Sequence, residues 1–316
     1  SFPLTHYYHG GTLFTCVGVA LACLEAIIHP NLHFYNSGYV YFTLSFPFGL
    51  SREQMSIALP IYAGVYSVTI SLLAVQFIYR YWALFSLNSL KYFRGWKSLI
   101  WFLYCLFFGL LWSVGEHYTI QMDEISENYF KKELLTRYGV LPKDIPMLTF
   151  IAYDPVDGSV RWLNVTFTIM ISSIMGFQYG VMIYCGWRMN SRMYSKMEEK
   201  IAGLSNALKH HHRQLFKTLV LQITCPTLLL FSPLVLIIYL PFFQIQLSFP
   251  AGATVCAFNI YPAMDSVIVL MVVTEYRVAV KRMWKNILKT FSAKKENQSG
   301  ESTGQITLST LRNSQP

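Results

Sequence analysis

The amino-acid sequence predicts an all-α membrane protein. Hydrophobic residues make up 53% of its 316 residues and charged residues 13%, whereas soluble proteins contain about 25% charged residues. The apolar residues lie in long runs, without the alternation of apolar and polar residues that is typical of a membrane β-barrel. Because lipid offers the backbone no hydrogen-bonding partner, each run is expected to form an α-helix.

Six segments are long enough to be membrane spans, since a bilayer core of about 30 Å requires roughly 20 apolar residues in a helix. The second to fifth segments contain no Asp, Glu, Lys or Arg, whereas the first contains Glu25 and the sixth contains Asp265. The expected spans are Gly11–Ile28, Ile57–Tyr79, Ser98–Gly115, Trp162–Trp187, Thr218–Leu240 and Pro250–Thr274.

Basic residues orient these spans, because cytoplasmic loops are enriched in Lys and Arg. The loop between the second and third spans has four, the loop between the fourth and fifth has seven, and the segment after the sixth has eight. We expect these three regions to be cytoplasmic. The loop of residues 116–161 has eight acidic and five basic residues and is expected to be an extracellular loop with structure of its own.

Six spans with a cytoplasmic C-terminus place residue 1 in the cytoplasm as well. The chain begins with Ser rather than Met, and we expect sequence to be missing in front. One further span there would give seven spans and an extracellular N-terminus.

Several classes of function are not expected. The sequence has no G-x-S-x-G, no H-E-x-x-H, no P-loop and no glycine-rich dinucleotide turn, so we expect neither an enzyme nor a cofactor. The basic residues flank membrane spans, which argues against nucleic-acid binding. His210, His211 and His212 are adjacent and cannot converge on a metal from one helical turn. All six cysteines lie in the expected spans and are interpreted as small apolar residues.

Polar and kinking residues inside the spans are candidate functional residues. A carboxyl such as Asp265 costs at least ~2.5 kcal/mol near the middle of a span, and it serves either as a polar switch or as a hydrogen-bonded packing group. Glu25 either lines a cavity or reaches the outer interface. Pro226, Pro233 and Pro262 are expected to kink their helices.

A further candidate is Arg80, in the stretch QFIYRYWAL. It ends a run of 23 residues without a charged side chain, Ile57–Tyr79, and it lies between Tyr79 and Tyr81. Arg80 is either an anchor at the cytoplasmic interface or part of a signalling switch. Farther along the chain, residues 275–291 predict a basic amphipathic helix on the inner leaflet, and residues 292–316 predict a disordered cytoplasmic tail.

Taken together, these motifs resemble the nematode serpentine chemoreceptors of the seven-transmembrane Str class. The match follows the order of that family from about residue 11 to residue 282. It rests on HP-NLHFYNSGY, QFIYRYWAL, KYFRGWK, MIYCGWRM, RQLFKTLVLQITCP with the later Pro233, and YPAMD followed by EYR.

The resemblance implies a GPCR-like seven-helix bundle of which six helices are visible here, the first being absent. It implies odorant or pheromone reception at the plasma membrane of sensory cilia, with signalling through a heterotrimeric G protein. Arg80 is similar in position to the arginine at the inner end of a receptor's third helix, although no acid precedes it. Pro226 and Asp265 fall where the family has its sixth-helix proline and seventh-helix acid.

We expect a small, apolar ligand in an outer cavity lined by the second, fifth and sixth spans and by the loop of residues 116–161. The G protein is expected to contact the basic loops and the amphipathic helix. An odorant-gated ion channel and a small-molecule transporter remain as alternatives, although a transporter should show repeated halves with paired broken helices.

Overall fold

The computed structural model describes residues 4–200, 220–255, 264, 267–268, 277–278 and 281–286. The chain divides into two compact units, Ser1–Asp265 and Ser266–Pro316. The long helices, the sheet and the sites described below all belong to the first unit. In the second unit, residues 277–278 and 281–286 are helical, with Met283 and Trp284 exposed. The rest of the expected amphipathic helix and the whole tail lie outside the described residues.

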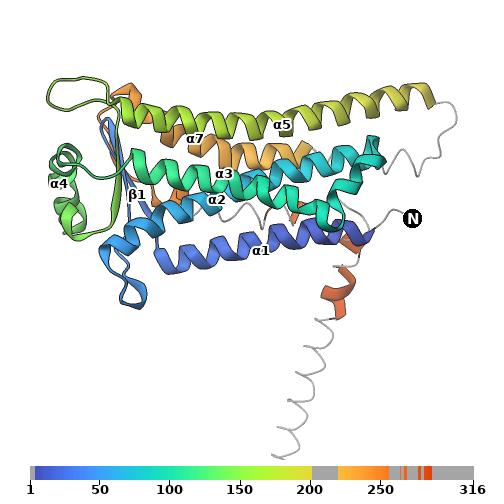
Figure 1. The fold of residues 1–316 in the computed structure, drawn as a ribbon, viewed down its shortest axis with the longest axis horizontal. Helices are drawn as coiled ribbons and strands as arrows, with labels where there is room; N and C mark the ends of the chain where they lie inside the picture. Colours follow the sequence, from blue (N-terminus) through green and yellow to red (C-terminus); the bar gives the residue numbers. More distant parts are fainter. Residues whose placement is uncertain are drawn as a thin grey trace, which may run out of the picture. The chain divides into compact units, whose positions relative to one another are not determined.

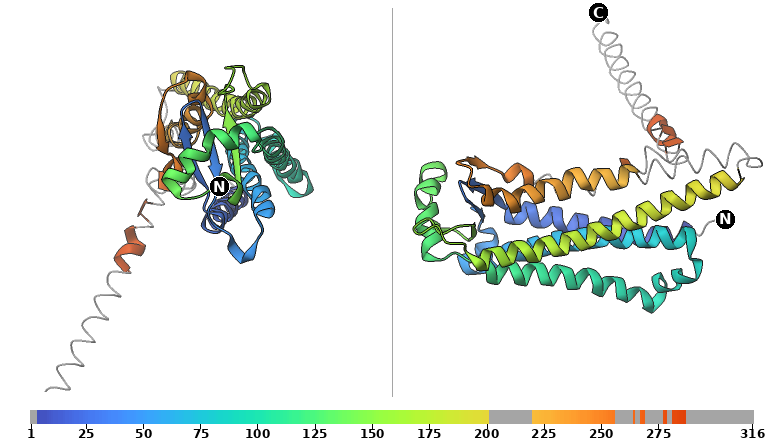
Figure 2. Two further views of the ribbon diagram at one scale, coloured as in Figure 1. Left: turned by 90° about the vertical axis from the view of Figure 1, so that its left-hand side faces the viewer. Right: turned by 90° about the horizontal axis from the view of Figure 1, so that it is seen from above.

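Long helices form the first unit and lie side by side (Figures 1 and 2). The helix α2 packs against α1, α3 and α5. The fifth expected span is a composite of helical residues 220–226, a π-helical turn, α7 and a short 3-10 helix. The bounds are α1 Leu4–Ile28, α2 Arg52–Phe85, α3 Leu99–Thr119, α5 Trp162–Lys200, the π turn Thr227–Phe231, α7 Ser232–Tyr239 and the 3-10 helix Leu240–Phe243.

Within the described residues, four segments have the length and hydropathy of membrane spans: Arg52–Phe85, Gly95–Thr119, Trp162–Arg192 and Val220–Phe243. They overlap the second to fifth expected spans. The first expected span falls in α1, of which Cys16–Ile28 is a shorter apolar helix. Most of the sixth, with Pro262 and Asp265, lies outside the described residues.

Local chemistry explains why two helices are longer than predicted. The helix α2 begins at Arg52, five residues before the expected start, because Ser51 and Gln54 form a capping box. The Gln54 amide nitrogen donates to the Ser51 hydroxyl, and the Ser51 amide donates to the Gln54 side chain over 2.8 Å. The helix α5 continues to Lys200, since leaving the apolar run does not end a helix when the next residues are good helix formers.

A four-stranded antiparallel sheet lies at one end of the bundle (Figure 1). The sequence predicted structure in the loop of residues 116–161 but no sheet. Its strands come from three loops that are far apart in the chain, and all three were expected to be extracellular. The order is β3-β2-β1-β4, with β1 Asn31–Tyr35, β2 Gly38–Phe42, β3 Met147–Ile151 and β4 Ser248–Pro250.

The two strands β2 and β3 are buried on both faces of the sheet. Tyr39 and Tyr41 of β2 join the core of the bundle, whereas Val40 and Phe42 pack on the other face with Phe130. Phe130 belongs to α4, Glu124–Tyr138, which is capped at its start by the Asp123 carboxylate and is followed by Gly139 with a φ of 68°. Because α4 covers one face and the bundle the other, the strands lack the alternating pattern that marks a half-exposed sheet.

Candidate functional site

The side chain of Arg80 is directed into the helical bundle. Its Nη1 donates a hydrogen bond to the Gln222 side-chain oxygen, and its guanidinium lies 5.6 Å from the centroid of the Phe77 ring. Gln222 is buried, on the helical residues 220–226. The contact therefore joins the C-terminal end of α2 to the helix that leads into the π turn. An interhelical partner of this kind is not needed by a residue that only anchors a helix at the headgroups.

Tyr79 and Tyr81 pack in two other directions. The Tyr79 ring meets Phe93 edge-on at 5.0 Å, and Phe93 ends the 3-10 helix Leu87–Phe93 in the loop between α2 and α3. The Tyr81 ring lies 6.5 Å from that of Tyr184 on α5. The three adjacent residues therefore touch three neighbouring parts of the fold. Asp265 lies outside the described residues, so the structure does not relate it to Arg80.

Two of the three predicted kink prolines flank a π-helical turn. Pro226 directly precedes the turn Thr227–Phe231, and the Ser232 amide donates to the Thr227 carbonyl, which closes the wider π ring. Pro233 follows at the start of α7. The turn packs on α5, where the Tyr179 and Thr227 hydroxyls are 3.1 Å apart. The prolines were predicted from the sequence, whereas the π turn between them was not.

A polar cluster lies beneath the sheet at the other end of the bundle. The Glu116 side chain near the end of α3 is buried, and its Oε2 has no hydrogen-bond partner in the described part of the chain. The same holds for the Tyr41 hydroxyl. Burial, and next the charge of Glu116, raise the pKa of Tyr41 well above its ordinary value. The Tyr62 hydroxyl donates to Glu25 over 3.3 Å, so Glu25 contacts the bundle.

Sequence reasoning missed Glu116, because it was counted as the first residue of the outer loop. The helix α3 in fact continues to Thr119. The signal that could have found it is an acid that directly follows an apolar run.

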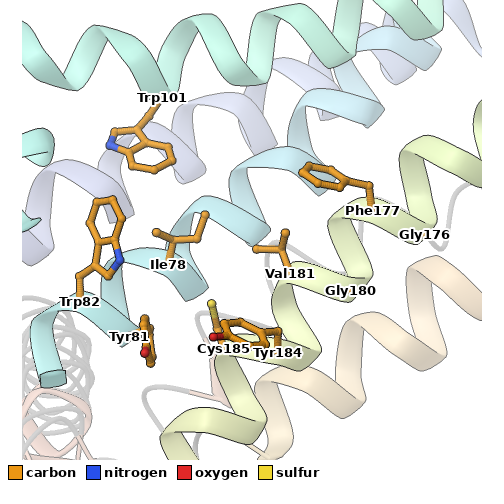
Figure 3. Close-up of a pocket in the computed structure, with 10 residues that line it drawn as sticks. All are labelled: Ile78, Tyr81, Trp82, Trp101, Gly176, Phe177, Gly180, Val181, Tyr184 and Cys185. Carbon is orange, nitrogen blue, oxygen red and sulfur yellow. The ribbon is translucent and has the colours of Figure 1, made fainter. Parts of the chain in front are cut away.

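An apolar groove of about 490 Å³ lies between α2, α3 and α5, toward the end of the bundle that was expected to be cytoplasmic (Figure 3). It differs in place from the predicted ligand cavity, which was expected at the outer end. Its walls include Trp82 and Tyr81 of α2, Trp101 of α3 and Gly180 of α5. In the described part of the chain, no group of three or more His, Cys, Asp or Glu side chains could hold a metal ion.

Comparison with known proteins adds the decisive observation. The family model of the serpentine type 7TM GPCR chemoreceptor Str matches residues 6–281. The chain belongs to this family. The fold is accordingly a GPCR-like helical bundle, and the Str receptor is a multi-pass membrane protein of a nematode chemoreceptor family.

Curated relatives of the Str receptor are themselves named as receptors. The G-protein coupled receptor str-33 of Caenorhabditis elegans is 34% identical over 86% of this chain and 79% of its own length. The serpentine receptor class r-10 of Caenorhabditis briggsae is 25% identical over 94% of this chain and 84% of its own. Its namesake in Caenorhabditis elegans is 25% identical over 84% of this chain and 77% of its own. No solved structure matches the chain.

Proposed function

We propose that this Str receptor detects a small, largely apolar odorant or pheromone at the plasma membrane of a sensory cilium and activates a heterotrimeric G protein. Ligand binding beneath the sheet shifts the bundle between two states of different ligand affinity. Family membership supports the general function. The Arg80–Gln222 contact supports the specific mechanism, since it joins two helices below a π turn.

In the proposed inactive state, Arg80 holds the inner end of the helix at residues 220–226 against α2. The π turn just above departs from the regular α-helical hydrogen bonding, as such turns often do at functional sites. The inner end can therefore move about the turn while α7 stays packed at the outer end. Gln222 takes the place of the acid that is missing before Arg80, and release of the contact exposes the inner side of the bundle.

The proposed ligand region is the core under the sheet. The stacked rings of Tyr39 and Phe150, 5.0 Å apart, and the ring of Phe242 provide an apolar environment there. The Glu116 carboxyl and the Tyr41 hydroxyl are the polar groups placed to receive a single polar atom of an otherwise apolar ligand. A buried polar group of this kind selects a ligand that satisfies it, because leaving it unpaired is costly.

The proposed G-protein surface includes the loop between α2 and α3. Trp96 is 87% exposed in this loop, and the loop carries three basic residues, Lys91, Arg94 and Lys97, on the side expected to be cytoplasmic. An exposed aromatic side chain surrounded by basic residues is suited to a protein partner.

Two substitutions test the mechanism in cells that express the full-length gene. We expect Arg80→Ala to reduce G-protein activation while surface expression stays near that of the wild type, because in the proposed active state the released Arg80 guanidinium contacts the G protein. We expect Gln222→Leu, which removes the partner but keeps Arg80, to raise ligand-independent activation. A loss of surface expression alone in Arg80→Ala would support the anchor interpretation. A ligand-evoked current that persists without any G protein would favour the ion-channel alternative.

A further inference from the structure

The groove near the inner ends of α2, α3 and α5 lies at the depth of the inner leaflet. With a rise of about 1.5 Å per residue, Gly176 is about 21 Å and Tyr184 about 33 Å along α5 from Trp162 at its outer end. The hydrocarbon core is about 30 Å thick. The groove therefore extends from the inner half of the core to the inner interface. Phe177 and Tyr184, which line it, are each about half exposed, so the groove opens toward lipid.

Two glycines leave space in the wall formed by α5 (Figure 3). Gly176 and Gly180 are one helical turn apart, and a Cβ atom added to either one would meet no atom within 4 Å. Trp82 and Trp101, whose rings are 5.6 Å apart, stand on the other side. The volume of about 490 Å³ lies within the range of about 300–1,000 Å³ that is typical of ligand pockets. An elongated apolar chain fits a groove of this kind.

The inner mouth of the groove is positively charged on both sides. On α5, the Arg188 Nε lies 3.4 Å from the Tyr184 hydroxyl, and the Arg192 guanidinium lies 5.4 Å from the Phe85 ring centroid. On the opposite side, Lys97 lies over the Tyr92 ring. Among the described residues, the four ion pairs all belong to the sheet end of the unit, and none involves these three basic residues.

We propose that this groove binds an anionic phospholipid of the inner leaflet. One acyl chain lies along Gly176 and Gly180, and the phosphate-bearing headgroup is held between Arg188 and Arg192 on one side and Lys97 on the other. The positive charge at the mouth of the groove favours an anionic lipid, because cytoplasmic leaflets are rich in anionic lipids and attract basic residues at the membrane surface. The Trp and Tyr rings at the mouth are the side chains that favour the interface.

The acyl-chain part is tested by filling the groove. The full-length chain is purified in detergent with equal amounts of phosphatidylserine and phosphatidylcholine of identical acyl chains, and retained lipid is counted by native mass spectrometry. We expect the wild type to retain phosphatidylserine at least about fivefold better, since each basic contact at a membrane surface contributes about that factor. Gly180→Leu should abolish this retention. Ser173→Leu adds the same side chain on α5 outside the groove and should not.

The headgroup part is tested by charge. We expect Arg188→Gln and Arg192→Gln each to lower phosphatidylserine retention about fivefold and to leave phosphatidylcholine unchanged. Lys131→Gln and Lys132→Gln make the same charge change on the exposed surface of α4 at the sheet end and should have no effect. Thermal melting verifies that each variant is folded. Gly180→Leu should not disrupt α5, because leucine is a better helix former than glycine.

Two results would overturn the proposal. One is equal retention of the two lipids by the wild type, and the other is unchanged retention by Gly180→Leu. If Gly180→Leu instead converted a dimer into a monomer with lipid retention intact, the groove would be a contact between two copies of the chain. The measurement involves neither agonist nor G protein. A result that overturns the lipid site therefore leaves the proposed receptor function standing.

Discussion

Glu116 is a residue whose burial works against the stability of the fold. Its side chain is 5% exposed, and Oε2 has no partner among the described residues. A buried polar group left unsatisfied costs about 1–3 kcal/mol, and more if it is charged. Such a group is expected where a ligand supplies the missing partner.

We expect Glu116→Leu to raise the free energy of unfolding by about 1–3 kcal/mol and to abolish the response to the ligand. The leucine keeps a similar side-chain length and removes the unpaired oxygen. Thermal melting of the purified protein measures the first effect, and a G-protein activation assay measures the second. A destabilised Glu116→Leu protein would show that the hydrogen bond between this carboxyl and the Trp112 side chain outweighs the cost of the unpaired oxygen, and it would remove the reason to place the ligand there.

At the scale of single residues, the sequence identifies a candidate more readily than its partner. Arg80 could be found because it ends a long uncharged run. Its partner Gln222 lies 142 positions away, and nothing in the spacing of polar residues connects the two. Glu116 was not identified as a candidate because the expected span ended one residue before it, although the helix continues to Thr119.

Among the elements, α2 and α3 pack closely at two glycines. A Cβ atom on Gly64 would lie 2.8 Å from the Gly109 carbonyl oxygen, and a Cβ atom on Gly109 would lie 2.5 Å from a Val68 methyl group. Small residues of this kind allow helix backbones to approach one another in membranes.

We therefore expect Gly64→Ala to destabilise the bundle by about 1–3 kcal/mol, because the backbone oxygen cannot move aside without separating the helices. Gly176→Ala places the same methyl group in open space on α5 and should leave stability unchanged or raised. Denaturation of both purified variants compares the two positions. Equal stability of both would show that α2 and α3 are less closely packed than described.

Between α4 and the sheet, a buried histidine links three elements. His33 of β1 is fully buried, with Nε2 3.2 Å from Glu133 and Nδ1 3.1 Å from the Tyr138 hydroxyl, both on α4. The Ser248 hydroxyl of β4 donates to Glu133 over 2.6 Å, and Arg137 forms an ion pair with the same carboxylate. The cluster fastens α4 to both β1 and β4.

Burial lowers the pKa of His33, although Glu133 partly offsets this effect. The unfolded chain then takes up a proton more readily than the folded one, so stability falls as the pH drops below the ordinary histidine value of 6.5. Burial tends to raise the pKa of Glu133, but hydrogen bonds from Ser248 and Arg137 lower it overall, so its contribution is lost only below its ordinary value of 4.5.

Melting temperatures of the purified protein from about pH 8 to about pH 5 measure the histidine effect. We expect stability to decline in that range for the wild type and to be flatter in His33→Gln, which keeps a donor for Glu133 without titrating. An equal slope in both proteins would assign the pH dependence to other groups.

Element boundaries show where sequence patterns lose their information. Hydropathy located the second to fifth spans, because each is an uninterrupted apolar run. It did not locate the start of α2 at Arg52, since the Ser51 capping box is made of polar residues outside the run. The sequence did not predict the strands, because each has only three to five residues and is recognised only by its pairing with a distant partner.

For the molecule as a whole, the sheet agrees with the alternation of the expected spans across the membrane. Its strands come from the loops after the first, third and fifth expected spans, and these loops were all expected to be extracellular. Loops that share one sheet must lie on the same side of the membrane. The alternation of the spans predicts this common side, and the charge distribution adds the prediction that it is extracellular.

The orientation is tested with epitope tags at two exposed sites. Val156 is 90% exposed in the loop before α5, and Trp96 is 87% exposed in the loop between α2 and α3. We expect a tag after Val156 to bind antibody on intact cells and a tag after Trp96 to bind only after permeabilisation. The reverse pattern would place the sheet in the cytoplasm and exclude the proposed G-protein surface.

The sheet has a consequence for how a stimulus reaches the receptor. Its strands β2 and β3, buried on both faces, lie between the polar cluster around Glu116 and α4. Under the proposed function, a ligand that first dissolves in the bilayer would reach this cluster from the side, between helices. Among chemicals of equal intrinsic affinity, those with the larger oil–water partition coefficient would then be sensed at the lower aqueous concentration. The bilayer around the receptor would concentrate them before they bind.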